Sequence, residues 1–107
     1  MTERQLKAAR AEPLDHMLLH INIGEKLLRG STDKVVSAKH FAARDWDYKV
    51  EVTLSGETLT SQQPISHDQM LWAAQKDDTF DFNGTKRTVK AKVIYESGGQ
   101  YFCELQI

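Results

Sequence analysis

Two histidines stand four residues apart, the spacing that brings two imidazoles to one face of a helix. His16 and His20 could therefore share a metal ion, as paired helix histidines do in zinc proteases. The zinc-protease motif places a glutamate directly after the first histidine, whereas this chain has Met17 there. No cysteine or carboxylate is placed by motif to complete the set. We therefore predict no metal site, and we interpret the pair as part of an amphipathic helix surface.

Nucleophilic catalysis requires a nucleophile, a base and an orienting group, and the sequence places no such set together. Cys103, the only cysteine, lies in an alternating run, where a small buried apolar side chain is expected. Asp77 and Asp78 are adjacent, so on a strand their carboxylates would point apart. Residues 30–32 (Gly-Ser-Thr) lack the spacing and the lysine of a phosphate loop. We predict that the protein is not an enzyme and that it holds no cofactor.

Basic residues gather on a predicted strand near the C-terminus. They are Lys86, Arg87, Lys90 and Lys92. Because side chains alternate between the two faces of a strand, Phe102 of the following strand is expected on the same face as the lysines. Strand faces of this kind bind nucleic-acid backbones when an aromatic ring provides a stacking surface beside the cations. Asp81 and Glu104 are expected to neutralise part of this face. The five residues are therefore candidate nucleic-acid contacts, and a solvated surface strand is the other interpretation.

Residues 44–48 (Arg-Asp-Trp-Asp-Tyr) place a tryptophan between two acids where a loop meets a strand. Tryptophan, tyrosine and arginine are the residues found most often at the energetic centres of protein interfaces. We therefore expect Trp46 and Tyr48 to contact a protein partner. The other interpretation is that Trp46 covers one end of a barrel.

The composition limits the class of protein. With 107 residues, 40% hydrophobic and 27% charged, the chain suits one domain with a modest core, which we place at residues 1–107. The formal net charge of -1 gives no support for a globally basic nucleic-acid binder. The N-terminus lacks the apolar core of a signal peptide, and no apolar stretch approaches the length of a membrane span. We expect a cytoplasmic protein without membrane contact, in keeping with its single cysteine.

The histidine pair depends on a helix that we predict over residues 13–30, after a polar N-terminal arm of residues 1–12. Pro13 suits the first helical position, and Gly30 suits the C-terminal cap. One apolar stripe contains Leu14, Met17, Leu18, Ile21 and Leu28, and a second contains His16, His20, Ile23 and Leu27. Two such faces favour a helix packed between its own sheet and a partner, although deeper burial under the strands would produce the same pattern. The predicted protein interface is therefore His16, His20, Ile23, Leu27, Trp46 and Tyr48.

Residues 31–107 have the alternation and turn signals of a β-rich body. Residues 48–54 alternate apolar and polar side chains as a half-buried strand does. A short helix over residues 67–76 interrupts the strands, and Ser66 with Gln69 provides a capping box at its start. These elements predict an α+β fold in which the N-terminal helix packs on a twisted antiparallel β-meander or a small β-barrel, with a short helix between strands.

Two hairpins are predicted near the C-terminus. Asn83-Gly84 is typical of a two-residue type I′ turn and would pair Phe82 with Thr85. The last hairpin turns at residues 97–99. With an odd loop length, one of its faces carries Val89, Ala91, Val93, Tyr101, Cys103 and Leu105. We expect this apolar face to point inward and the lysines to point outward.

The C-terminal part of the chain resembles a known family. From Pro64 onward, a short capped helix leads to residues 78–84 (Asp-Thr-Phe-Asp-Phe-Asn-Gly), a valine-bearing strand, a Gly-Gly turn and a final strand. This order resembles the C-terminal half of the small head–tail joining (connector or stopper) proteins of tailed phages, over residues 64–107. The family's leading Gly-Asp is Asp77-Asp78 here. The resemblance implies a non-enzymatic subunit arranged in a ring between portal and tail.

Residues and resemblance together predict a non-enzymatic structural or assembly protein that acts through protein–protein contacts. Its expected partners are further copies of itself, neighbouring assembly proteins of a virion, or both. One alternative is a small β-barrel module that binds nucleic acid through the candidate contacts named above. Another is a small inhibitor or immunity-type protein that blocks a partner's site, which the sequence does not separate from an assembly protein.

Overall fold

Two short helices interrupt a series of strands in the parts of the chain that the computed structural model describes, residues 6–30, 32–44, 47–82 and 84–107. The elements are, in chain order, α1 (Leu14–His20), β1 (Lys26–Arg29), β2 (Thr32–Val35), β3 (Ala38–Arg44), β4 (Asp47–Leu54), β5 (Glu57–Thr60), α2 (His67–Ala73), β6 (Thr79–Phe82), β7 (Thr85–Thr88), β8 (Ala91–Ser97) and β9 (Gln100–Gln106). The fold is therefore α+β, as predicted. Neither of these helices has the length and apolar character needed to cross a bilayer.

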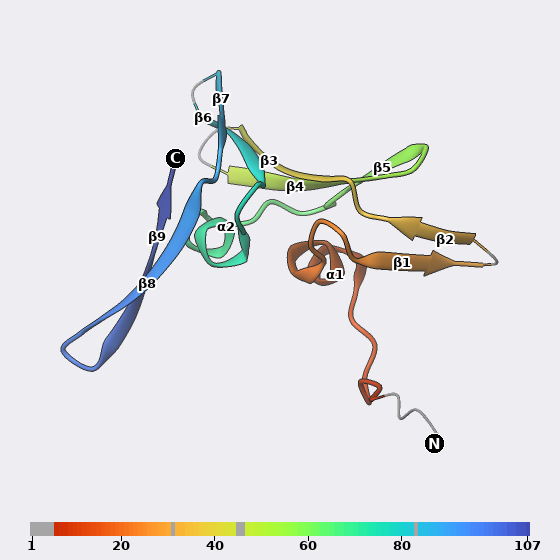
Figure 1. The fold of residues 1–107 in the computed structure, drawn as a ribbon, viewed down its shortest axis with the longest axis horizontal. Coiled ribbons are helices and arrows are strands. Elements are labelled where there is room, and N and C mark those ends of the chain that lie inside the picture. Colours follow the sequence, from red (N-terminus) through yellow and green to blue (C-terminus); the bar gives the residue numbers. More distant parts are fainter. Residues whose placement is uncertain (1–5, 31, 45–46, 83) are drawn as a thin grey trace.

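The central sheet has the strand order β5-β4-β3-β6-β7 (Figure 1). β4 pairs antiparallel with both of its neighbours, and its side chains alternate between the core and the opposite face, as predicted. β6 instead runs parallel to β3, because the α2 segment carries the chain across the sheet before β6 begins. The sheet is consequently mixed rather than an antiparallel meander. Among the described residues it stays open, with β5 and β7 at its edges, so the small-barrel alternative is wrong.

The two helices lie on the same side of the central sheet and bury apolar side chains against it (Figure 1). Leu18 of α1 and Met70 of α2 join Phe41 of β3 and Val50 of β4 in the hydrophobic core. Burying one such side chain contributes roughly 1.5–3 kcal/mol. Helices of this length are marginal alone in water, so packing on the sheet is what stabilises them.

The N-terminal helix is much shorter than the predicted span of residues 13–30. α1 ends at His20, Ile21 is already extended, and Gly24 has a positive φ of 90°. The residues after His20 are isoleucine, asparagine, isoleucine and glycine, all of which have lower helix propensity than alanine or leucine. The helix therefore stops where its intrinsic propensity falls.

The end of the predicted helix is instead β1, the first strand of the hairpin β1–β2, which turns at Gly30 with a φ of 61°. Pairing with β2 and contact with the core override the helical propensity of the lysine and leucines in β1. Ile23 and Leu27 therefore lie outside the helix, and so does Leu28. The prediction of two apolar stripes along one long helix is wrong.

α2 begins with the predicted capping box. Ser66 Oγ accepts a hydrogen bond from Gln69 N at 3.2 Å, and Gln69 Oε1 accepts one from Ser66 N at 2.9 Å. The helix ends at Ala73, before the predicted boundary. There Gln75 N donates a hydrogen bond of 2.8 Å to Asp78 Oδ2, so a turn replaces the last helical turn.

The hairpin β6–β7 has the predicted pairing. Phe82 pairs with Thr85, and Asp81 pairs with Lys86. Asn83, the first residue of the predicted turn, lies outside the described residues. The register nevertheless agrees with a two-residue turn between the two strands.

The last hairpin is separate from the central sheet. The chain leaves that sheet after Thr88, and β8 pairs only with β9 among the described strands. Its turn has two residues, Gly98 and Gly99, each with a positive φ, as a type I′ turn requires. Ser97 therefore pairs with Gln100 across an even loop.

The even loop reverses the predicted facing of side chains in β8, whereas Cys103 and Leu105 of β9 face the body as predicted. A change of one residue in register turns every side chain to the other face of a strand pair. Val93 pairs with Glu104 instead of facing the same way as Cys103, and Lys92 pairs with Leu105. The prediction of an inward Val93 and an outward Lys92 is wrong.

Candidate functional site

The hairpin β8–β9 is fixed to the body by one face. Cys103 Sγ donates a hydrogen bond of 3.3 Å to the carbonyl of Leu71, and Lys92 Nζ donates one to the carbonyl of Trp72. Leu105 packs against the hydrophobic core from the same face. These contacts hold the base of the hairpin on α2. They leave its opposite face to solvent, and nearer the turn Ile94 and Tyr101 of the anchored face are exposed as well.

We call that opposite face the β8–β9 outer face. Its members are Ala91, Val93, Tyr95, Ser97, Gln100, Phe102, Glu104 and Gln106. The rings of Tyr95 and Phe102 stack across the strands with centroids 5.6 Å apart and planes inclined by 23°. Tyr95 is 48% exposed, Phe102 is 42% exposed, and Val93 is exposed beside them. Such a pair stabilises the hairpin by about 0.5–1.5 kcal/mol beyond the area it buries, and it presents a rigid aromatic surface.

The hairpin β1–β2 is also anchored by one face. Leu27 packs against the core, and Glu57 Oε1 of β5 accepts hydrogen bonds from Arg29 at 2.7 Å and from Lys34 at 3.1 Å. These two hydrogen bonds lower the pKa of Glu57 below its usual value. The carboxylate thus ties both strands of the hairpin to the edge of the central sheet.

The opposite side of this hairpin, the β1–β2 outer face, consists of Lys26, Leu28, Asp33 and Val35. Leu28 is 64% exposed and Val35 is 47% exposed. Isolated exposed leucines are ordinary on protein surfaces. Here, however, the two apolar side chains share one small face with a lysine.

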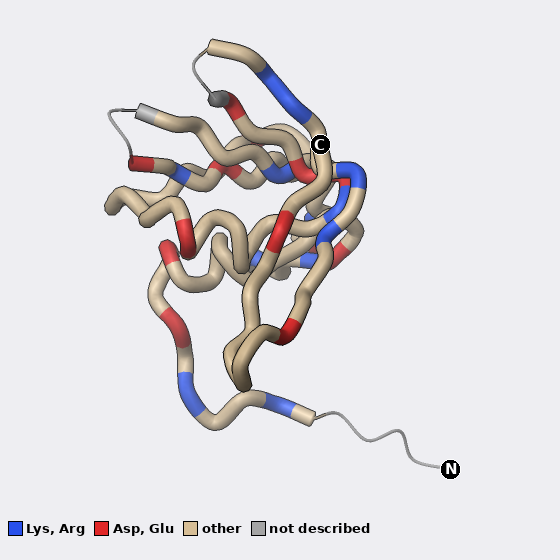
Figure 2. The backbone as a smooth tube through the Cα atoms, turned by 90° about the vertical axis from the view of Figure 1, so that its left-hand side faces the viewer, with Lys and Arg blue, Asp and Glu red and all other residues tan. Residues whose placement is uncertain are grey.

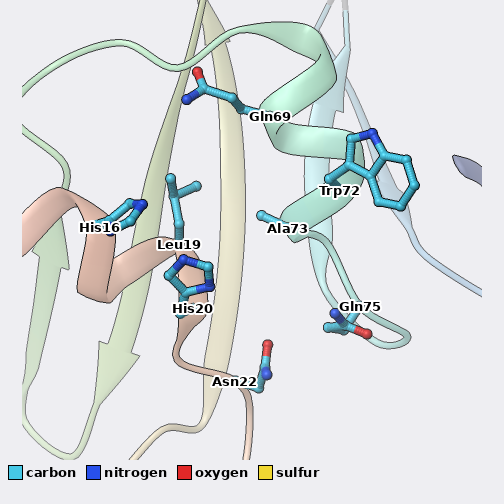
Figure 3. A pocket seen from close by; sticks show the side chains of 8 residues that line it. All are labelled: His16, Leu19, His20, Asn22, Gln69, Trp72, Ala73 and Gln75. Carbon is cyan, nitrogen blue, oxygen red and sulfur yellow. The ribbon is translucent and has the colours of Figure 1, made fainter. Parts of the chain in front are cut away.

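A cleft of about 310 Å³ separates α1 from α2 (Figure 3). His16 and His20 of α1 line it opposite Gln69, Trp72 and Gln75 from the α2 side, and the two imidazole rings meet edge to face with centroids 4.8 Å apart. His16 Nδ1 lies 2.8 Å from Glu12 Oε2. Asn22 Oδ1 is buried beside the cleft without a hydrogen-bond partner among the described residues. No group of three histidine, cysteine or carboxylate side chains able to hold a metal occurs in the described ranges.

A buried lysine holds the end of α1 on the sheet. Lys39 of β3 is 1% exposed, and its Nζ donates hydrogen bonds to the carbonyls of Leu19 at 2.7 Å and Ile21 at 2.8 Å. These carbonyls lie at the C-terminus of the helix, where a cation is favoured. Burial lowers the pKa of Lys39 to about 8, although the negative charges of Asp78 and Glu25 oppose the shift. All of its polar contacts are with the fold itself, so we assign it a structural role.

Asp78 is also buried, and its negative charge acts on Lys39 by favouring the protonated amine. Its Oδ2 accepts the hydrogen bond from Gln75 N, while its Oδ1 is buried without a partner among the described residues. Burial raises the pKa of Asp78, and the hydrogen bond from Gln75 together with the charge of Lys39 opposes that shift. The backbone carbonyl of Asp78 also accepts a hydrogen bond of 2.8 Å from Val89 N, directly after the end of β7. The residue closes the turn between α2 and β6.

The structure does not bring the candidate nucleic-acid contacts together. Lys92 is on the anchored face of β8–β9, whereas Phe102 is on the outer face. Lys86 and Arg87 are exposed on β7, where they point to opposite faces of the strand, and Lys90 lies between β7 and β8. Figure 2 shows acidic and basic positions interspersed along the backbone on this side of the molecule.

The predicted protein interface is also dispersed. Tyr48 is only 3% exposed and lies in the core, with its hydroxyl 3.2 Å from His67 Nδ1, so it does not present a contact surface. Leu27 faces the core, and Ile23 is exposed in the connection between α1 and β1. Trp46 lies outside the described residues. Only His16 and His20 remain together, in the cleft.

Sequence reasoning missed the aromatic pair on β8–β9. The pairing of Tyr95 with Phe102 depends on the length of the Gly-Gly turn, and the odd-loop interpretation placed them on different faces. The two consecutive glycines were the available signal, because a type I′ turn uses two residues with positive φ. Lys39 gave no signal, since a lysine at an alternating position normally indicates a solvent-facing side chain.

No family model matches the sequence, and neither a curated protein nor a solved structure shows significant similarity to it.

Proposed function

We propose that this protein is a non-enzymatic structural or assembly protein that acts through protein–protein contacts and associates with further copies of itself. The observation that carries the proposal is the β8–β9 outer face, where a stacked Tyr95–Phe102 pair and Val93 remain exposed on an anchored hairpin. The hairpin projects from the body beside α2 (Figure 1). Its free face is therefore accessible to another molecule.

The aromatic pair can supply a useful part of a binding free energy. Tyrosine and phenylalanine each bury about 150–250 Å² when fully covered. Because about half of each ring is exposed, covering both would contribute roughly 5 kcal/mol at about 25 cal/mol per Å². That is the scale of an interface hot spot, but it lies at the low end of the roughly 4–15 kcal/mol that association costs. We therefore expect weak self-association that needs additional contacts around the pair.

Association with further copies is compatible with the charge of the chain. The formal net charge is -1, so copies do not repel one another strongly, and proteins near zero net charge associate more readily. A ring subunit of the head–tail joining kind, the family that residues 64–107 resemble, is the specific form that we propose. The nucleic-acid alternative gains no support, because Lys92 and Phe102 occupy opposite faces of the hairpin.

Sedimentation velocity over a wide range of protein concentration tests this function. We expect the sedimentation coefficient of the wild type to rise with concentration, and Tyr95→Ser to need at least tenfold more protein for the same rise. Tyr101→Ser is the matched control, because Tyr101 lies on the other face of the same hairpin and is also exposed. A wild type that stays monomeric at every concentration, or an equal loss in both variants, would refute the proposal.

A further inference from the structure

We infer that copies of this chain join head to tail, with the β8–β9 outer face of one copy packed on the β1–β2 outer face of the next. This inference rests on the proposed function, because it names the surface that receives the hairpin. The two faces belong to different parts of the chain, so one copy offers both halves of the contact.

The positions of the two hairpins favour contacts between copies. β1–β2 projects at one end of the longest axis of the molecule, and β8–β9 projects at the other end (Figure 1). A copy cannot bring its own two hairpins together across the body. Pairing of two different patches on identical subunits is a heterologous contact, which leads to a closed ring or an open chain of subunits.

The two faces are complementary in character. The β1–β2 outer face offers the exposed Leu28 and Val35, which can pack against the aromatic pair of the β8–β9 outer face. Lys26 lies at the end of β1–β2 away from its turn, and Glu104 lies in the corresponding part of β8–β9. Neither of these two side chains has an ion-pair partner among the described residues. If the two hairpins stack with their turns at the same end, Lys26 of one copy would therefore lie beside Glu104 of the next.

The acid on the β1–β2 outer face does not oppose this arrangement. Asp33 lies next to the turn of its hairpin, where it pairs with Leu28. The part of the β8–β9 outer face nearest its own turn carries Ser97 and Gln100, both uncharged. Their side chains can donate hydrogen bonds to a carboxylate, so Asp33 would meet donors rather than another acid.

A symmetric contact between two β8–β9 outer faces is less favourable. Glu104 is the only charged residue of that face. Pairing the face with itself would bury two carboxylates in one interface without a cation, and like charges in an interface destabilise it. The β1–β2 outer face supplies the missing cation through Lys26.

Both hairpins also lack cover on one side. Two-stranded hairpins are marginally stable in water unless they pack against something else. Each hairpin here packs on the body through a single face, and a neighbouring copy would cover the other. The contact is small, because four-residue strands span about 13 Å and seven-residue strands about 23 Å. Interfaces of this size are typical of weak association, so we expect a dissociation constant in the micromolar range or above.

Mixing two variants tests the head-to-tail contact in the full-length protein. Leu28→Ser weakens one face, Tyr95→Ser weakens the other, and both side chains are exposed, so circular dichroism should show unchanged folds. Each variant alone should self-associate at least tenfold more weakly than the wild type. An equimolar mixture should form dimers with one copy of each variant, because each retains the face that the other has lost. Leu6→Ser, at an exposed leucine outside both faces, is the matched control and should associate like the wild type.

A charge reversal gives an independent test. Lys26→Glu and Glu104→Lys should each weaken self-association by about tenfold or less, and the double variant should recover most of the wild-type association. If the wild type associates but Leu28→Ser associates equally well, the head-to-tail contact is refuted while the proposed function stands. If the mixture forms no mixed dimer, the contact is also refuted. If the wild type does not associate at all, both proposals fail.

Discussion

Replacing Lys39 by methionine should change how stability depends on alkaline pH. Lys39 has a pKa of about 8 in the folded protein, against an ordinary value of 10.5. Below pH 8 both the folded and the unfolded chain keep the proton, so this group adds no pH dependence. Between pH 8 and 10.5 the unfolded chain binds more protons at this site than the folded chain does. The free energy of unfolding must therefore rise with pH across that window.

The shift between the two pKa values sets the magnitude. A shift of about 2.5 units corresponds to about 3 kcal/mol of stability, gained as the pH rises from 8 to 10.5. The neutral amine still has two N–H donors for the carbonyls of Leu19 and Ile21, so the hydrogen bonds survive deprotonation. Lys39→Met removes the titration together with both hydrogen bonds. At neutral pH it relieves the burial of a charge but leaves two carbonyls unpaired, and these effects have opposite signs.

Urea unfolding of the wild type and Lys39→Met at several pH values measures the effect. The wild-type free energy minus that of the variant should rise by about 3 kcal/mol between pH 8 and 10.5. Other lysines and tyrosines titrate in this range, but their contributions largely cancel in the difference. Lys49→Met, at an exposed position of β4, controls for the loss of one lysine. A difference that stays flat across the window would show that Lys39 keeps its charge in the folded protein, and burial would then not lower its pKa.

Three further predictions concern the body of the fold, each measured by urea unfolding. Burial raises the pKa of Asp78, so the folded state binds the carboxyl proton more tightly than the unfolded state does. The wild type should therefore gain stability relative to Asp78→Asn as the pH falls towards 3.8. The opposite trend would contradict the burial of this carboxyl. Ser66→Ala should lose about 1 kcal/mol because it removes one bond of the capping box, and an unchanged midpoint would show that the box contributes nothing. Leu18→Ala should cost about 2–5 kcal/mol, whereas Leu14→Ala on the exposed side of the same helix should cost far less; equal losses would mean that α1 does not dock through Leu18.

Elements with short, self-contained signals could be predicted from the sequence. The capping box of Ser66 and Gln69, the alternation of β4 and the pairing of Phe82 with Thr85 each depend on a few neighbouring residues. Such local chemistry is the same whatever surrounds it. These elements therefore have the predicted type, with boundaries close to the expected ones.

Elements that depend on distant partners could not be predicted. β1 is a strand because β2 pairs with it, although its lysine and leucines equally suit a helix. β6 lies parallel to β3 because of the path of the chain through α2, which no local pattern specifies. For the candidate site, the sequence indicated Phe102 as a surface aromatic but paired it with lysines. The two-residue turn placed it beside Tyr95 instead.

Amide NMR spectra recorded from low micromolar to near-millimolar concentration test whether the outer faces of the two hairpins are contact surfaces between copies. Resonances of β8, β9, β1 and β2 should shift or broaden with concentration, while those of β5 should remain constant. Tyr95→Ser should suppress the changes in both hairpins. Spectra that do not depend on concentration, or changes confined to the cleft between α1 and α2, would contradict the claim.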